Sequence, residues 1–237
     1  MVLQHWLHTE CRYYLYNKVM DIRKIVNELI EAISGDSPID QILLKAQIVA
    51  FAIDNADFTS FIKCEQAGYS PEDAIPDYRK ISSRVQATFA TPFFPSQTVT
   101  VPTELIKDQH IKDLMTFVTM RQPLIQLDAM YYNAIESLVS VELLAFAYPT
   151  IESLYKQNGQ KVYSAFHQFP KESLLSIVCT FKSRLLQMLL QFDKELDWKL
   201  DLTTGYNRQT TTTIINNINA VVANTGNGNV ETKDINY

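Results

Sequence analysis

The sequence predicts a mostly α (α+β) fold, in which a helical domain carries a small two-stranded β element and is followed by a β-prone C-terminal tail. Apolar residues recur with the 3.6-residue period of an amphipathic helix in several long segments. One stretch instead alternates with the period of two that is typical of a half-buried strand. Strands and helices do not alternate regularly along the chain, which argues against a parallel α/β sheet.

Three apolar stripes predict the first three helices, over residues 21–34, 39–53 and 57–67. Ser37 and Pro38 suit the start of the second helix, because serine can cap a helix and proline fits the first turn. The short link before this helix predicts an antiparallel hairpin with the first one.

The period-two stretch predicts a strand over residues 80–89, with Ile81, Val85 and Phe89 on one face. A second strand is predicted over residues 97–101, where Pro102 ends it. Together they form the expected two-stranded element.

Helical stripes resume in residues 103–147, with a break or kink at Pro123, and again in the closing helix, residues 171–198. Residues 160–169 are consistent with a strand or with irregular structure.

Both ends differ from the central domain, which is predicted to span residues 20–202. Residues 1–19 carry no clear period and are interpreted as an extension. Residues 203–237 are rich in Asn and Thr, with two strand-capable runs around a Thr-Gly-Asn-Gly-Asn turn. Because stacked strands with Asn ladders are stable, we expect this tail to support a homo-oligomer.

Composition narrows the function classes. The chain has 237 residues, a net charge of -5 and no run of Lys or Arg, so we expect no nucleic-acid partner. No stretch has the length of apolar residues that a membrane span needs, so we expect no membrane partner. The three cysteines, Cys11, Cys64 and Cys179, are far apart and odd in number, which favours a reducing, cytoplasmic location.

The sequence contains no recognisable catalytic constellation. Neither a GxxxxGK[ST] nor a GxGxxG motif is present, so a Gly-rich phosphate loop is not expected. His5 and His8 have no third ligand nearby in the sequence, and His110 and His167 have no adjacent nucleophile. We therefore expect no cofactor, no metal site and no catalytic residue.

The run FTSFIKCEQAGYSPEDAIPDYRKI, residues 58–81, resembles the AbiTii domain family, and the order of features extends the resemblance over about residues 20–200. Family members carry an acidic residue near a helix end, a Gly-Tyr pair, an acidic loop and a Pro-x-Tyr-Arg element that opens a strand. Gln66-Ala67 departs from the longer polar turn that members more often have. The resemblance implies a role in limiting phage growth, often by stopping the infected cell, and it implies no known reaction.

Four residues of this run form the candidate binding site: Glu65, Tyr69, Tyr78 and Arg79. In the structural interpretation, Tyr78 and Arg79 pin a loop to a helix, and Arg79 pairs with a carboxylate such as Glu65. In the functional one, the tyrosines and Arg79 meet an anionic ligand or partner.

Two functions remain open at this point. The first is an anti-phage defence protein that binds a phage or host protein and self-associates through residues 203–237. The alternative is a toxin-type enzyme that acts on nucleic acid or a nucleotide, with a site around Tyr78 and Arg79. The absence of a catalytic motif favours the first, and a subunit of a two-gene system is a third possibility.

Overall fold

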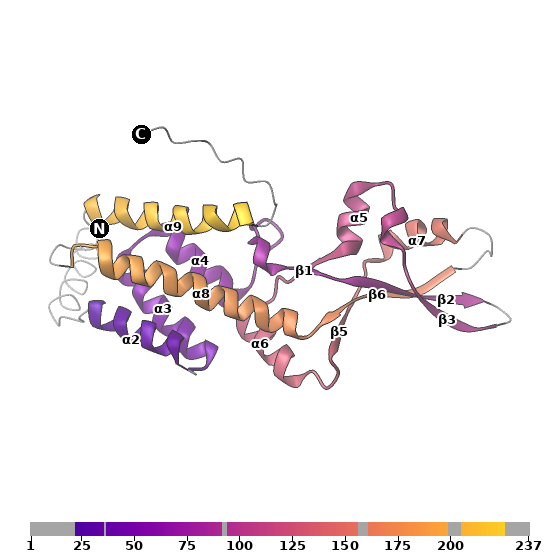
Figure 1. The fold of residues 1–237 in the computed structure, drawn as a ribbon, viewed down its shortest axis with the longest axis horizontal. Coiled ribbons are helices and arrows are strands. Elements are labelled where there is room, and N and C mark those ends of the chain that lie inside the picture. The colour runs from indigo at the N-terminus through magenta and orange to yellow at the C-terminus, as the bar shows by residue number, and fades with distance from the viewer. Residues whose placement is uncertain (1–21, 36, 92–93, 156–160, 199–204, 226–237) are drawn as a thin grey trace, which may run out of the picture. The chain divides into compact units, whose positions relative to one another are not determined.

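The computed structural model describes residues 22–35, 37–91, 94–155, 161–198 and 205–225 (Figure 1). The chain divides into two compact units. Unit 1 combines residues 1–66 with residues 182–237, whereas unit 2 is the continuous segment 67–181. The predicted extension, residues 1–19, lies outside the described residues.

In its described residues, unit 1 contains helices joined by short links and no strand. Its elements are α2 (Ile22–Ser34), α3 (Ile39–Ile53), α4 (Ala56–Ala67), the second part of α8 (Glu172–Glu195) and α9 (Gly205–Thr225). The first three confirm the helices predicted near the N-terminus, and α2 packs against α3 across the short link between them.

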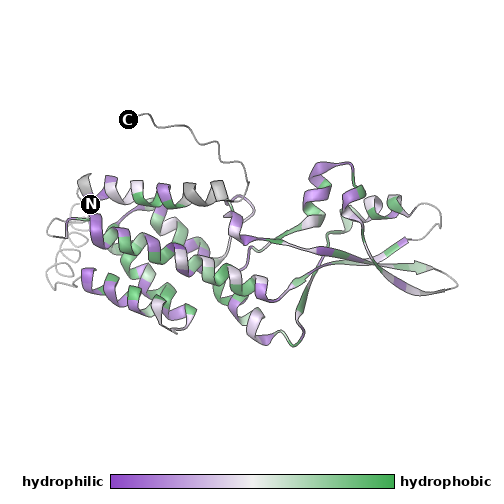
Figure 2. Ribbon diagram, in the orientation of Figure 1, coloured by the Kyte–Doolittle hydropathy of each residue, from purple (hydrophilic) through white to green (hydrophobic). Residues whose placement is uncertain are grey.

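The core of unit 1 is built from the predicted apolar stripes. Figure 2 shows apolar and polar residues sharing each of these helices. Val26, Leu29 and Ile33 are the buried residues of α2. Phe58 of α4 and Phe192 of α8 meet edge to face, with ring centroids 5.4 Å apart. Such aromatic pairs stabilise a core beyond the area that they bury.

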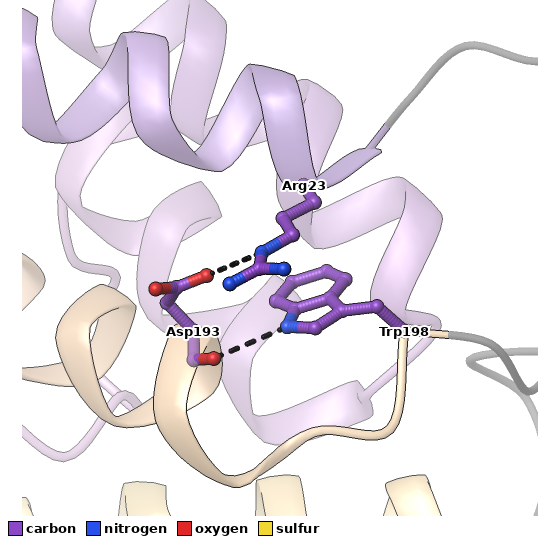
Figure 3. A network of polar contacts seen from close by, with 3 residues as sticks. All are labelled: Arg23, Asp193 and Trp198. Carbon is purple, nitrogen blue, oxygen red and sulfur yellow. Dashed lines mark hydrogen bonds and ion pairs between the residues drawn. The ribbon is translucent and has the colours of Figure 1, made fainter.

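A small polar network closes one end of this helical unit (Figure 3). The Nε of Arg23, in α2, donates a hydrogen bond of 2.8 Å to the Asp193 carboxylate in α8. The indole Nε1 of Trp198 donates to the main-chain carbonyl of Asp193 at 3.2 Å. Asp193 therefore joins the start of α2 to the segment that follows α8.

The prediction of a β-prone tail was wrong for the part of the tail that the structure describes, because Gly205–Thr225 forms the helix α9. Thr and Asn have modest helix propensity, but tertiary packing routinely overrides propensity. Five buried residues of α9 recur on one helical face: Asn207, Thr211, Ile214, Ile215 and Ile218. Since two of them are polar, the stripe was missed in the sequence. The second strand-capable run, residues 229–236, lies outside the described residues.

Several polar contacts hold α9 within unit 1. The Asn207 side chain exchanges hydrogen bonds with the main chain of Asp197, at 3.1 and 3.2 Å. Arg208 forms an ion pair with Asp54 at 2.8 Å. The Asn55 side chain donates to the Thr212 hydroxyl at 2.9 Å. These contacts make α9 a structural part of the helical unit.

Unit 2 contains both sheets. The four-stranded antiparallel sheet has the order β3-β2-β6-β5, and β1 pairs with β4 in a separate two-stranded sheet. The strands are β1 (Lys80–Ser82), β2 (Arg84–Thr91), β3 (Phe94–Thr100), β4 (Phe117–Thr119), β5 (Leu138–Glu142) and β6 (Lys161–Pro170). The predicted two-stranded element is confirmed as the β2–β3 pair, but it belongs to a larger sheet.

Two helices of unit 2 pack on the four-stranded sheet, α5 (Gln109–Thr116) and α7 (Tyr148–Leu154) (Figure 1). Met115 of α5 and Ile151 of α7 share a buried cluster with Val85, Ala87 and Ala165 of the sheet. The remaining elements are α6 (Leu124–Asn133) and three short 3-10 helices, η1 (Asp77–Arg79), η2 (Thr103–Leu105) and η3 (Ala145–Ala147).

The prediction that residues 103–147 are helical was wrong for β4 and β5. Val118 in β4 pairs with Ile81, and Val141 in β5 pairs with His167. Leu138, Val141 and Leu144 are spaced to fit a helical stripe, while Val139 and Val141 fit a strand. Pairing with distant segments, which a single sequence does not reveal, decides between the two.

Within the described residues, α8 alone is long and apolar enough to cross a membrane by length and composition. A core helix of a folded domain passes the same test. The buried residues of α8 include Leu174, Phe181, Leu185 and Phe192, so α8 has the character of such a core helix.

Candidate functional site

The Pro-x-Tyr-Arg element of unit 2 opens a strand, as the sequence predicted. Asp77–Arg79 forms the 3-10 helix η1, and the main-chain N–H of Arg79 donates to the carbonyl of Pro76 at 3.0 Å. β1 follows at Lys80. The fixed φ of Pro76 sets the direction of the chain just before the turn.

Arg79 is the centre of this element, and its side chain is completely buried, with 0% exposure. Its Nη1 donates to the main-chain carbonyls of Met120 and Gln122, at 3.0 and 2.7 Å. Its own carbonyl accepts a hydrogen bond from the N–H of Met120 at 2.9 Å. The guanidinium lies over the Tyr69 ring, 4.7 Å from its centroid. Arg79 thus joins three segments that are separate in the sequence.

The Gly68-Tyr69 pair brings the preceding loop to the same place. The N–H of Tyr69 donates to the carbonyl of Arg121 at 2.8 Å. Gly68 has a φ of 88°, and a Cβ added there would lie 2.8 Å from the same carbonyl oxygen. Only glycine adopts this backbone and this approach without strain. The Arg121 guanidinium in turn donates to the carbonyl of Ser70.

The structure thus brings Tyr69 and Arg79 together in unit 2. Tyr78 is half-buried in η1 of the same unit, and Glu65 is fully buried in α4, within unit 1.

The arrangement around Arg79 suits a structural role. A buried guanidinium is stabilised by hydrogen bonds to carbonyl dipoles and by an aromatic face, and here it has both. The main-chain acceptors, Met120 and Gln122, were missed because a carbonyl carries no signature in the sequence. The amide Oε1 of Gln122 is buried without a hydrogen-bond partner in the described structure. The prediction that the Tyr69, Tyr78 and Arg79 group binds a ligand stays a prediction.

A second polar pair in unit 2 was also missed, Ser83 with His167. The Ser83 hydroxyl lies 2.8 Å from Nδ1 of His167, and it is 3.3 Å from the carbonyl of Thr116. Ser83 separates β1 from β2, and His167 lies in β6. They are far apart in the sequence, so only the sheet brings them together.

The Ser83–His167 pair has part of the geometry of a nucleophile and its base. Catalytic pairs of this kind usually include a third group that orients the imidazole. No carboxylate in the described part of the chain is hydrogen-bonded to His167. His167 is only 5% exposed, and burial lowers its pKa below the ordinary value. The pair is therefore best described as a part-buried structural hydrogen bond that joins the residue before β2 to β6.

Metal-ligating side chains do not gather in the described residues: no group of three or more His, Cys, Asp or Glu side chains could hold an ion there.

The family model described as AbiTii matches residues 24–217. This range begins near the start of α2 and includes most of α9. No curated protein and no solved structure matches the chain.

Proposed function

Because the chain belongs to the AbiTii family, and because membership implies abortive-infection defence against phage, we propose that it acts by binding proteins, itself included, and not as an enzyme. The expected partners are a phage or host protein and further copies of this chain, in the cytoplasm.

The observation that carries this proposal is a group of exposed apolar side chains in unit 2. They lie within β5 or on either side of it in the sequence: Tyr132, Ile135, Leu138, Leu144 and Phe146. Ile135 is 100% exposed, and Phe146 is 58% exposed. Single exposed apolar residues are common, but five of them between residues 132 and 146 support a protein-binding role for this segment.

The arrangement around Arg79 supports the same proposal. A side chain that is fully buried and bonded to main-chain carbonyls has little freedom to receive a substrate. The competing hypothesis, a toxin-type enzyme, needs Arg79 to contact a nucleotide. The enzyme hypothesis predicts that expression of the wild-type chain is toxic and that Arg79→Lys abolishes this toxicity. The variant must keep the far-UV circular dichroism spectrum of the wild type for this result to count.

The proposal is tested by phage challenge of cells that carry the gene, with and without its neighbouring genes. We expect fewer plaques with the wild-type chain and loss of protection with the double variant Ile135→Ser/Phe146→Ser. Both side chains are exposed, so the variant should melt at the wild-type temperature. Gln97→Ser, an exposed change in β3, is the control and should protect fully. Full protection by the double variant would remove the exposed apolar group as the basis of function.

A further inference from the structure

The outer side of β5 is an open sheet edge. β5 is the last strand in the order β3-β2-β6-β5, and it pairs with β6 without a bulge. The N–H of Leu143 donates to the carbonyl of Ala165, and the N–H of Lys171 donates to the carbonyl of Ser137, both at 2.9 Å. Residues 137 and 143 therefore face β6 with their main-chain groups.

Alternate residues of a strand direct their main-chain groups to opposite sides. Leu138, Ser140 and Glu142 consequently direct their N–H and C=O groups outward. In the described residues, no strand pairs with this side of β5. Three donors and three acceptors are therefore available in a row for another strand.

β5 also lacks the features that usually protect an edge strand. Natural edges carry proline, lysine or bulges, which block pairing with another chain. The sequence of β5 is Leu-Val-Ser-Val-Glu, with a single charge at its end. The opposite edge, β3, contains Pro95, and its pairing with β2 is irregular near Phe94. The two edges of the sheet thus differ, and β5 is the edge without a feature that blocks pairing with another strand.

The residues around β5 indicate what it pairs with. Exposed apolar side chains lie both before it, at Tyr132 and Ile135, and after it, at Leu144 and Phe146. An antiparallel partner with the same sequence brings the apolar segment before β5 next to the apolar segment after it. A second copy of this chain is therefore complementary to β5 in both its backbone and its apolar ends.

We propose that the outer edge of β5 pairs with β5 of a second copy, antiparallel and about a twofold axis at Ser140. This rests on the proposed function, because it names the surface and the partner for self-association. Two four-stranded sheets then become one continuous sheet. A twofold interface of this kind is closed, so it produces a dimer and not a filament.

The register follows from the axis at Ser140. Ser140 lies opposite its own copy, and Leu138 lies opposite Glu142 of the second copy. Each of these is a hydrogen-bonded pair, which exchanges two hydrogen bonds. The two Glu142 carboxylates are then roughly 14 Å apart along the strands, so like charges do not oppose each other.

The first experiment removes one outward N–H from each edge of the full-length protein. Ser140→Pro deletes a donor on the outer side of β5 and leaves the hydrogen bonds to β6 in place. Thr98→Pro is the matched control on β3. Its N–H also faces outward, because the neighbouring odd-numbered residues bond to β2, as Val101 does to Val85 at 2.9 Å. Light scattering should give a dimer for the wild type and for Thr98→Pro, and a monomer for Ser140→Pro.

The second experiment tests the register and does not depend on proline. In a chain with Cys11, Cys64 and Cys179 changed to Ser, Ser140→Cys should form a disulfide-linked dimer on mild oxidation. Opposed residues of a hydrogen-bonded pair have Cα atoms about 5.5 Å apart, within disulfide range. Glu142→Cys, roughly 14 Å from its copy by the strand rise, should not crosslink.

The outcomes separate this inference from the proposed function. A wild-type protein that is monomeric at all concentrations overturns β5 pairing. So does the combination of a Ser140→Pro protein that remains dimeric with a Ser140→Cys protein that does not crosslink. If Ser140→Pro also melts at a lower temperature than Thr98→Pro, the crosslinking pair decides alone. Protection against phage that survives either result leaves the proposed defence function standing. If the wild-type chain gives no protection against phage, the proposed function is contradicted. That result does not bear on a dimer that has been measured in solution.

Discussion

Arg79 is a charged residue that is removed from solvent and used to hold backbone segments together. Its guanidinium donates to two carbonyls of the segment 120–122 and lies over the ring of Tyr69, so it joins two other segments of unit 2. Removing the guanidinium leaves buried carbonyls without donors. The resulting loss in the free energy of unfolding is larger than the net contribution of the hydrogen bonds themselves.

We predict that Arg79→Met lowers the free energy of unfolding by about 3 kcal/mol, because the stem remains and the buried hydrogen bonds are lost. Urea unfolding monitored by circular dichroism measures this change. Arg84→Met is the control, because Arg84 is exposed in β2 and should change stability by less than about 0.5 kcal/mol. Wild-type stability for Arg79→Met, combined with loss of function, would instead indicate a ligand site at Arg79.

His167 makes stability depend on pH in a defined direction. Burial lowers its pKa in the folded protein, so the unfolded chain binds the proton more tightly. The contribution of neutral His167 to the free energy of unfolding should therefore be fully present above about pH 6.5. As the pH drops below that value, the free energy of unfolding should fall by at most about 1.4 kcal/mol per pH unit.

The contribution of His167 is isolated by His167→Asn, which retains a polar group near Ser83 and cannot titrate. We predict a flatter stability profile below about pH 6.5 for this variant than for the wild type. His110→Asn, at an exposed position in α5, is the control and should keep the wild-type slope. A wild-type slope in His167→Asn would show that another group causes the dependence.

At the scale of elements, α9 shows how packing decides the structure of an ambiguous sequence. Its Thr and Asn residues would suit a strand or a turn, yet its buried face contributes Ile214 and Ile215, at 2% and 1% exposure. The gain from burying these side chains outweighs the small deficits in helix propensity, which are below about 1 kcal/mol per residue.

We expect Ile215→Ala to lower the free energy of unfolding by about 3 kcal/mol, because it leaves a cavity in the core of unit 1. Chemical denaturation provides the measurement. Asn216→Ala changes the exposed neighbour and should stay within about 0.5 kcal/mol of the wild type. Equal effects of the two substitutions would mean that α9 does not pack through this face.

The whole molecule combines a continuous unit with a discontinuous one. Unit 2 is the segment 67–181, whereas unit 1 needs residues from both ends of the chain. The helix α9 therefore belongs to the structure of unit 1, and we expect its removal to affect that structure directly.

We predict that a chain ending at Leu202 loses amide protection in α2, α3 and α4, because it lacks the buried face of α9 and the Arg208–Asp54 ion pair. Hydrogen exchange with mass spectrometry measures this segment by segment. A chain ending at Thr225 retains α9 and is the control. Unchanged protection in the shorter chain would contradict the assignment of α9 to unit 1.

The sequence by itself determined the features that depend on local pattern. The helices α2, α3, α4 and α8, the β2–β3 pair, the Pro76–Arg79 turn and the family were all predicted, because each has its own period or motif within a short window. The helices in particular need only residues a few positions apart.

Only the tertiary structure decided the features that depend on distant partners. β4 and β5 are strands because β1 and β6 pair with them, and α9 is a helix because unit 1 buries one of its faces. The Arg79 acceptors and the Ser83–His167 pair join residues far apart in the chain. Such contacts depend on which segments meet, and a single sequence carries no local signal for that.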